Sequence, residues 1–220
     1  MSEKFQAPRG THDVLPSDHL WWHVIRTMEG QAARYGWRRV QTPGFEDTGL
    51  FERTSGQASD VVNKEMYSFR DRSDRSLTLR PEGTAPIARA YVEHGLHRDP
   101  QPVKAYAIVP MYRYGAPGRG RYREHWQLSL EAIGAAGPEI DAEVIHFYAE
   151  LLGTLGVSDW ELRLNSIGDR QCRPRYVERL NAWLDAHDDL LDDEARRADY
   201  RTRLVLYEAG RPARVTGGEG

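Results

Sequence analysis

A pair of strand-like segments, joined by a loop rich in glycine and arginine, constrains the fold of this chain more than any other feature. Residues 103–113 form a nearly continuous apolar run, and residues 123–134 alternate polar and apolar side chains with a period of two. We expect the segments to pair as an antiparallel hairpin closed by Arg113 and Arg123, with odd-numbered residues of both strands on the same side. The even-numbered face of the second strand is expected to join the core through Trp126, Leu128 and Leu130.

The opposite face of this hairpin is polar and carries groups of both charges. Its expected members are Arg113, Arg123, His125, Gln127, Ser129 and Glu131. Such a face suits a zwitterion, because Glu131 can accept an ammonium, Arg113 can hold a carboxylate or phosphate by two hydrogen bonds, and Gln127 can fix orientation. It equally suits ATP phosphates, held by Arg113, Arg121 and Arg123. Spacing alone also fits the solvated face of an ordinary amphipathic strand, so these interpretations stay open at this level.

The remaining periodicities indicate a mixed α+β chain. Helices are predicted over 17–35, 48–56, 81–95, 138–156 and 169–187, and further strands over 37–43, 66–70, 77–80 and 160–166. Several hairpins between helices favour a largely antiparallel sheet, since a doubly wound parallel fold would alternate strands and helices more regularly. The composition changes after residue 187, so we expect one domain over 1–187 and a divergent, flexible C-terminal segment over 188–220.

Composition excludes several classes of function. The net charge of −3 gives no global basic signature, so contact with nucleic acid or phosphate would depend on local clusters of arginine. The single cysteine, Cys172, excludes an intramolecular disulfide framework and a thiolate-rich zinc site, and the histidines form no metal-binding motif, so no metal site is expected. With no secretory signal and no apolar run of membrane-spanning length, we expect a cytoplasmic protein without a membrane partner.

Five segments, in order along the chain, resemble the histidyl-tRNA synthetase family. They are residues 8–16 (PRGTHDVLP), 40–56 (VQTPGFEDTGLFERTSG), 79–90 (LRPEGTAPIARA), 111–134 (MYRYGAPGRGRYREHWQLSLEAIG) and 164–169 (LNSIGD). The resemblance implies the N-terminal part of a class II aminoacyl-tRNA synthetase catalytic core, an antiparallel sheet flanked by helices that works as a homodimer. It further implies a histidine–tRNA ligase, which activates histidine with ATP and Mg²⁺ and transfers it to tRNA-His.

The resemblance also assigns roles to individual residues. It gives histidine binding to Glu82, Thr84, Gln127 and Glu131. Arg113 resembles the motif 2 arginine that contacts the α-phosphate of ATP and the substrate carboxylate, and it is the expected catalytic residue. Arg121 and Arg123 resemble loop residues that meet ATP or the acceptor end of the tRNA, and the segment around Pro43 resembles part of the dimer interface. These roles suit adenylation, in which two anions must be held together and a fixed guanidinium can neutralise the charge that develops.

The sequence departs from the family at three points. Gly115 stands where motif 2 usually has an acidic residue expected to meet the adenine end of ATP. Neither a block resembling RGLDYY nor the motif 3 region is found, and residues after 187 do not resemble the family's insertion domain. We therefore expect an incomplete core, whether as a fragment, a truncated gene product or a shortened paralogue. The alternative functions are a non-catalytic histidine-binding paralogue, such as the regulatory subunit of ATP phosphoribosyltransferase, and an inert or dimer-forming remnant.

Overall fold

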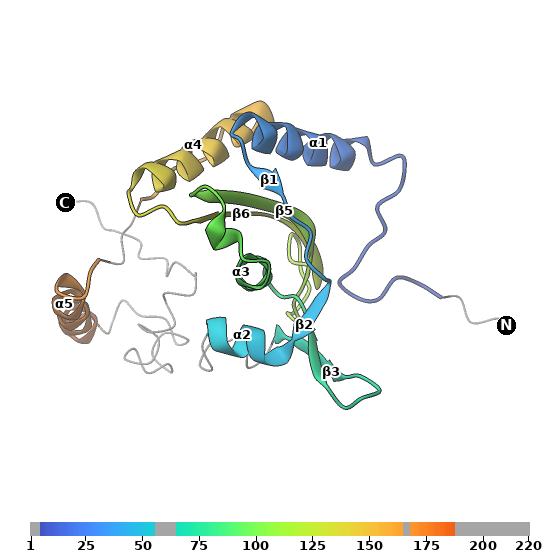
Figure 1. The fold of residues 1–220 in the computed structure, drawn as a ribbon, viewed down its shortest axis with the longest axis horizontal. Helices are drawn as coiled ribbons and strands as arrows, with labels where there is room; N and C mark the ends of the chain where they lie inside the picture. The colour runs from blue at the N-terminus through green and yellow to red at the C-terminus, as the bar shows by residue number, and fades with distance from the viewer. Residues whose placement is uncertain (1–4, 56–64, 165–167, 188–220) are drawn as a thin grey trace. The chain divides into compact units, whose positions relative to one another are not determined.

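The computed structural model describes residues 5–55, 65–164 and 168–187. The chain divides into two compact units, Met1–Trp160 and Glu161–Gly220, which are described separately. The described part of the first unit is a mixed α+β structure with two three-stranded sheets (Figure 1). Among the described residues, no helix combines the length and the apolar character that crossing a membrane requires.

The first sheet contains the predicted hairpin. Its strand order is β1 (Arg38–Arg39), β5 (Val103–Tyr112) and β6 (Glu124–Ile133). β5 and β6 are antiparallel from the pair Tyr112 and Glu124 to the far end of both strands. The main-chain N–H of Arg113 donates to the carbonyl oxygen of Arg123 at 2.9 Å, which extends the pairing as expected. The predicted register is therefore confirmed, and odd-numbered residues of both strands share a face.

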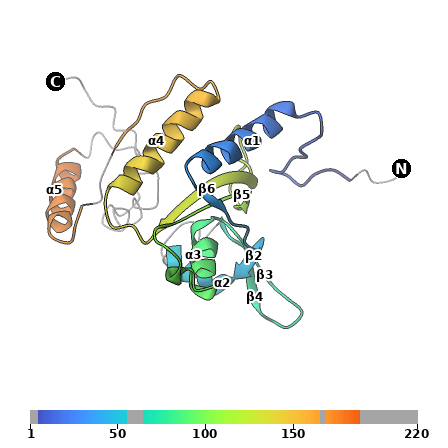
Figure 2. The same ribbon diagram turned by 45° about the horizontal axis from the view of Figure 1, so that its top comes forward.

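Helices cover both faces of this sheet. α1 (His19–Arg34) and α4 (Glu139–Thr154) lie over one face, and α3 (Thr84–Glu93) lies against the other (Figure 2). The core under α1 and α4 consists of Ala32, Trp37, Tyr106, Ile108, Phe147 and Leu151. The core under α3 consists of Ile87, Ala105, Ala107, Val109 and Met111. Even-numbered and odd-numbered residues of β5 thus enter different cores, as the alternation of a strand requires.

The even-numbered face of β6 follows the prediction in part. Leu128 and Leu130 pack against the core under α1 and α4. Trp126 remains 44% exposed, so it lies at the margin of this core. Its ring meets that of Trp21 edge to face, with the two centroids 5.9 Å apart.

The second sheet is antiparallel and has the order β2 (Phe45–Asp47), β4 (Ser76–Leu79) and β3 (Tyr67–Arg70). The β3–β4 hairpin confirms the prediction for 66–70 and 77–80, and α2 (Thr48–Ser55) confirms the helix predicted after residue 48. A short 3₁₀ helix, η2 (Leu96–Arg98), follows α3. The largely antiparallel arrangement expected from the sequence is confirmed: the described strands form two sheets, and every pair among them is antiparallel except β1 with β5.

Several boundaries differ from those predicted. The strand predicted over 37–43 is confined to β1, and Pro43 has no N–H with which to continue a ladder. α1 begins at His19 with Asp18 at its N-cap position rather than Ser17, and the Asp18 carboxylate instead accepts the N–H of Leu15 at 2.7 Å. α3 begins at Thr84, three residues later than predicted.

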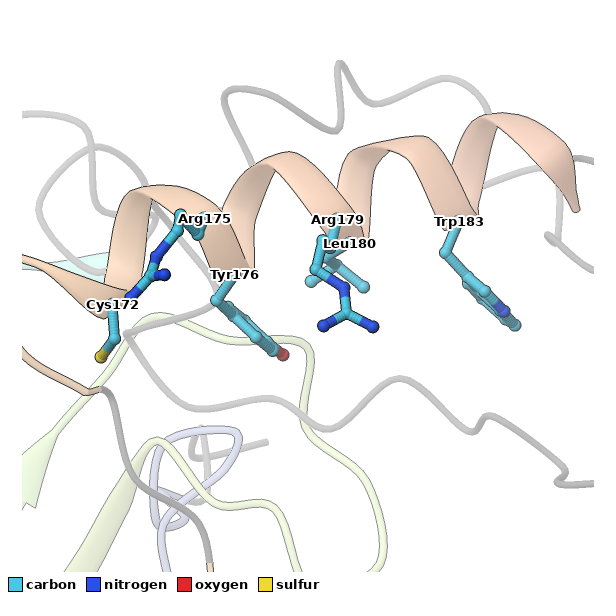
Figure 3. Close-up of a pocket in the computed structure, with 6 residues that line it drawn as sticks. All are labelled: Cys172, Arg175, Tyr176, Arg179, Leu180 and Trp183. Carbon is cyan, nitrogen blue, oxygen red and sulfur yellow. The ribbon is translucent and has the colours of Figure 1, made fainter.

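The second unit contributes α5 (Cys172–Ala186). The Asp169 carboxylate accepts the N–H groups of Gln171 at 2.8 Å and Cys172 at 2.6 Å, and these bonds hold the pKa of Asp169 below its usual value. Figure 3 shows side chains on one side of this helix, namely Cys172, Arg175, Tyr176, Arg179, Leu180 and Trp183. None of these six was predicted as a site residue.

The strand predicted over 160–166 is wrong for its described part, residues 160–164, which have no ladder partner. The side chains of this segment contact one another or solvent: Glu161 pairs with Arg163 at 3.0 Å, and Leu162 is 56% exposed. Among the described residues, no neighbouring strand pairs with the segment. Residues 188–220, predicted to be a flexible segment, lie outside the described part of the chain, and the domain boundary at 187 stays a prediction.

Candidate functional site

Residues 80–84 (RPEGT) connect β4 to α3 and include the first residue of α3, Thr84; they carry two of the predicted histidine-binding residues. The Glu82 carboxylate accepts the N–H of Thr84 at 2.6 Å and the N–H of Ala85 at 2.9 Å. These bonds satisfy free donors at the start of α3 and place a negative charge where the helix dipole favours it. The Thr84 hydroxyl donates in turn to Oε1 of Glu131 at 2.7 Å. The structure therefore brings Glu82, Thr84 and Glu131 into one hydrogen-bonded group.

Gly83 permits this close approach of α3 to β6. A Cβ atom at Gly83 would lie 2.4 Å from the Ser129 hydroxyl oxygen and 3.1 Å from the terminal methyl of Met111. Ser129 is 4% exposed, and its hydroxyl accepts the Gln127 side-chain amide at 3.0 Å. Gln127 thus lies on the same polar face as predicted, and it is oriented by a buried neighbour.

The Glu131 carboxyl group is only partly accessible, and its surroundings change its acidity. Burial raises the pKa of Glu131, the hydrogen bond from Thr84 lowers it, and the negative charge of Glu82 raises it. The hydroxyl of Tyr148, on α4, donates to the carbonyl oxygen of Leu128 at 3.1 Å, and burial and the negative charge of Glu131 raise the pKa of Tyr148. A half-buried carboxylate is suited to receive a positively charged or N–H donating ligand.

Arg113 lies at the other end of the same face. Its Nε atom donates to the carbonyl oxygen of Pro81 at 2.7 Å, which links β5 to the RPEGT connection. Within the described residues, no hydrogen-bond or ion-pair partner holds its two terminal nitrogens. Burial and the positive charge of Arg113 lower the pKa of His125. The guanidinium therefore has a fixed stem and two terminal nitrogens that can bind an anion.

Arg121 and Arg123 make contacts within the loop and its surroundings. The Arg121 guanidinium pairs with Glu65 at 3.1 Å. The Arg123 guanidinium stacks 4.1 Å from the centre of the Tyr114 ring, and its Nε donates to the carbonyl oxygen of Gly115 at 3.2 Å. The loop itself thus supplies the partners of Arg123, and its place on the shared polar face stays a prediction.

The N-terminal PRGTHD segment also docks on this hairpin. The carbonyl oxygen of Gly10 accepts the main-chain N–H of Arg123 at 2.7 Å. Gly10 has φ of +85°, and a Cβ atom there would lie 2.8 Å from Cγ of Arg123. Both constraints favour glycine at this position.

Sequence reasoning missed Arg80, the first residue of RPEGT. Its side chain is buried, at 5% exposure, and its guanidinium donates to three main-chain carbonyl oxygens, those of Thr42, Pro43 and Pro110. One feature of the sequence could have indicated its buried position, namely a charged residue placed directly between an apolar strand and a proline. Across the described part of the chain, no group of three or more histidine, cysteine, aspartate or glutamate side chains is arranged to hold a metal ion.

Comparison with known proteins identifies the family of this chain. The sequence model of the histidyl-tRNA synthetase family matches residues 10–169. The chain belongs to this family. It is 48% identical over 204 residues to a histidine–tRNA ligase of Dehalococcoides mccartyi, a match that covers 92% of the chain and 49% of that relative. The chain therefore spans about half the length of the curated relatives it matches.

Solved structures give the same family at the level of the fold. The apo histidyl-tRNA synthetase of S. aureus matches with a TM-score of 0.65 and 38% identity, over 83% of this chain and 49% of that one. A protein from Bacillus halodurans C, described as an ATP phosphoribosyltransferase regulatory subunit/histidyl-tRNA synthetase, matches with a TM-score of 0.63 and 23% identity, over 94% and 56%. The second likeness concerns the fold alone. Together they confirm the class II synthetase fold expected from the sequence.

Proposed function

We propose that this chain is the part of a histidine–tRNA ligase that selects histidine and holds it for reaction with ATP. The hydrogen bond between Thr84 and Glu131 is the observation that carries the proposal, because it joins two candidate histidine-binding residues from separate elements. The partly free guanidinium of Arg113 supports it, since the same face of the sheet then offers a carboxylate for the cationic end of histidine and a cation for its carboxylate.

In this proposal the acidic and amide groups choose the amino acid. Glu82, Gln127 and Glu131 pair with the ammonium and imidazole groups of histidine, and Thr84 fixes the Glu131 carboxylate. An analogue that lacks those N–H groups would leave buried acceptors without partners, and this penalty provides discrimination. The raised pKa of Glu131 supports the proposal, because a bound cationic ligand compensates for the charge that burial disfavours.

Arg113 serves the chemical step. A carboxylate oxygen of histidine attacks the α-phosphorus of ATP, the bond from that phosphorus to the pyrophosphate oxygen breaks, and histidyl adenylate and pyrophosphate form. Arg113 binds both the carboxylate and the α-phosphate, which brings two anions together and neutralises the charge that develops between them. No nucleophile from the protein is needed.

The remaining partners follow from the same assignment. ATP enters with Mg²⁺ as part of the substrate, and Arg121 and Arg123 meet ATP or the acceptor end of tRNA-His. The segment around Pro43 contributes to a homodimer, and the protein works in the cytoplasm. The regulatory-subunit alternative is not favoured, because the relative at 48% identity is a histidine–tRNA ligase, whereas the structure that carries the regulatory name is 23% identical.

Histidine-dependent exchange of pyrophosphate into ATP tests this proposal on the protein expressed from its gene, alongside calorimetric titration with histidine. We expect exchange that requires histidine, and a loss of roughly 100- to 1,000-fold in Arg113→Ala. Arg38→Ala is the matched control, since Arg38 is an exposed arginine of β1, and it should retain full exchange. Absence of both exchange and histidine binding, or full exchange in Arg113→Ala, would contradict the proposal.

A further inference from the structure

Arg80 is a buried cation held by main-chain oxygens. Its Nε atom donates to the carbonyl oxygen of Pro110 at 2.7 Å, and its Nη1 atom donates to those of Thr42 at 3.0 Å and Pro43 at 3.2 Å. No ion pair is formed by Arg80 among the described residues, and burial lowers its pKa. Burying a charged side chain costs free energy unless its hydrogen bonds are satisfied. The hydrogen bonds of Arg80 meet this condition, and they tie its own segment to residues 42–43 and to residue 110.

The main chain at residues 80 and 81 adds three more bonds at the same place. The N–H of Arg80 donates to the carbonyl oxygen of Gly44 at 3.1 Å, and the N–H of Tyr112 donates to that of Arg80 at 2.9 Å. The next carbonyl oxygen, that of Pro81, accepts Nε of Arg113 at 2.7 Å. The group that orients Arg113 therefore lies one residue from the buried guanidinium.

We propose that Arg80 is the positioning residue for Arg113. Its side chain holds residues 80–81 against the end of β5 and against residues 42–44, and the Pro81 carbonyl then sets the direction of the Arg113 guanidinium. Arg80 is buried away from solvent and acts through Arg113 rather than on the substrate. This inference rests on the proposed function, because it concerns how the terminal nitrogens of Arg113 meet the carboxylate and the α-phosphate.

The shape of the side chain explains why arginine occupies this position. A planar guanidinium presents donors in a fixed fork, so one side chain can reach carbonyl oxygens from two separate segments at once. A lysine keeps the charge but offers a single nitrogen on a flexible stem, so it can satisfy only part of this set. Arg80→Lys should therefore keep the fold while loosening the position of Pro81 and, with it, that of Arg113.

A double-mutant cycle on the protein expressed from its gene tests this inference, with a non-hydrolysable histidyl-adenylate analogue as the ligand. We expect Arg80→Lys to weaken analogue binding about tenfold when Arg113 is present, and less than about twofold in the Arg113→Ala background. The affinity for free histidine should change less than the affinity for the analogue, because the phosphate contact belongs to Arg113. Thermal unfolding of each variant shows that it is folded.

Arg89→Lys is the matched control. Arg89 is a partly buried arginine whose guanidinium pairs with Glu46 and Glu93, and none of its hydrogen bonds among the described residues goes to residues 42–43 or 110. Its replacement should lower stability and show no coupling to Arg113→Ala. If Arg80→Lys weakens analogue binding by the same factor in the Arg113→Ala background, the role of Arg80 is merely structural and the inference is overturned.

Two further results separate the possible failures. If the unmodified protein does not bind the analogue, the proposed function fails and the inference fails with it. If it binds the analogue and the effects of Arg80→Lys and Arg113→Ala on affinity are additive, only the inference fails. Should Arg80→Lys not fold, hydrogen exchange of the unmodified protein replaces it. Analogue binding must then slow exchange of the Tyr112 amide, which donates to the Arg80 carbonyl, and unchanged exchange overturns the inference.

Discussion

The Thr84 hydroxyl lies 2.7 Å from Oε1 of Glu131, and this hydrogen bond joins the first residue of α3 to β6 across 47 positions of the sequence. Together with the close approach of Gly83 to Ser129, it holds the start of α3 against β6. The Glu131 carboxylate is therefore held in one position before a ligand binds, and this reduces the conformational entropy lost on binding.

Removal of the Thr84 hydroxyl tests the value of this bond. Thr84→Val keeps the shape of the side chain but cannot donate, so the pKa of Glu131, which this bond lowers, should rise further. A hydrogen bond to a charged group contributes about 1.5–3 kcal/mol, so histidine should bind roughly 10- to 100-fold more weakly. Calorimetry measures the affinity, and Thr27→Val is the control, because Thr27 donates only within α1. Unchanged affinity would remove Thr84 from the site.

Glu131→Gln should stabilise the protein at neutral pH while abolishing selective histidine binding. The folded-state pKa of Glu131 is raised chiefly by burial, so its charged form is less favourable in the folded chain than in the unfolded chain. Glutamine has no charge to bury and can still accept the Thr84 hydroxyl. The gain should be present above the folded-state pKa and vanish as the pH falls below the ordinary glutamate value of about 4.3.

Glu150→Gln is the control for that experiment, because it should change the stability at neutral pH in the opposite direction. Hydrogen bonds from Tyr35 and Gln31 lower the pKa of Glu150. Its replacement should therefore destabilise the protein at neutral pH, and the loss should disappear as the pH falls through the folded-state pKa. Urea unfolding between pH 3 and pH 8 compares the two variants. A neutral or destabilising Glu131→Gln at pH 7 would contradict the account of Glu131 given above.

Gly83→Ala should destabilise the first unit by about 1–3 kcal/mol, because the new methyl group would overlap the Ser129 hydroxyl. Ser129→Ala in the same chain should restore part of the loss, since it removes the atom that lies 2.4 Å from the added Cβ. Gly118→Ala is the matched control, with no atom within 4 Å of its added Cβ. Equal unfolding free energies for the two alanine variants would show that the α3–β6 approach can relax.

Local patterns predicted the parts of this fold that depend on short-range order. The period of two over β6 and the apolar run over β5 gave the hairpin its register, and that register placed His125, Gln127, Ser129 and Glu131 on one face. The resemblance to the family supplied the roles of Glu82 and Thr84, which no spacing argument could. The structure adds their hydrogen bond to Glu131, but their part in binding histidine stays a prediction.

Long-range contacts decided the features that were missed or wrong. Arg80 has an ordinary sequence context, and only the folded chain brings the carbonyl oxygens of residues 42, 43 and 110 around it. Residues 160–164 have a strand-like composition, but a strand needs a partner edge, and none is present among the described residues.

Gly115→Glu returns an acidic residue to the position where the family usually has one, and the structure predicts where its charge will go. A Cβ atom at Gly115 would lie 3.3 Å from Nε of Arg121, whose flexible end can shift by the little that is required. The new carboxylate should therefore pair with Arg121, beside the existing partner Glu65.

We expect this exposed pair to add about 0.2–1 kcal/mol of stability, to weaken at 1 M salt, and to change ATP affinity less than about threefold, because the acid is already engaged. Gly115→Gln has the same shape without the charge, so it should give no salt-dependent gain. Urea unfolding at two salt concentrations and calorimetric titration with ATP measure both effects. An ATP affinity at least tenfold higher in Gly115→Glu than in the unmodified protein would contradict this prediction. The new carboxylate would then bind the nucleotide rather than Arg121, and Gly115 by itself would explain the departure from the family at this position.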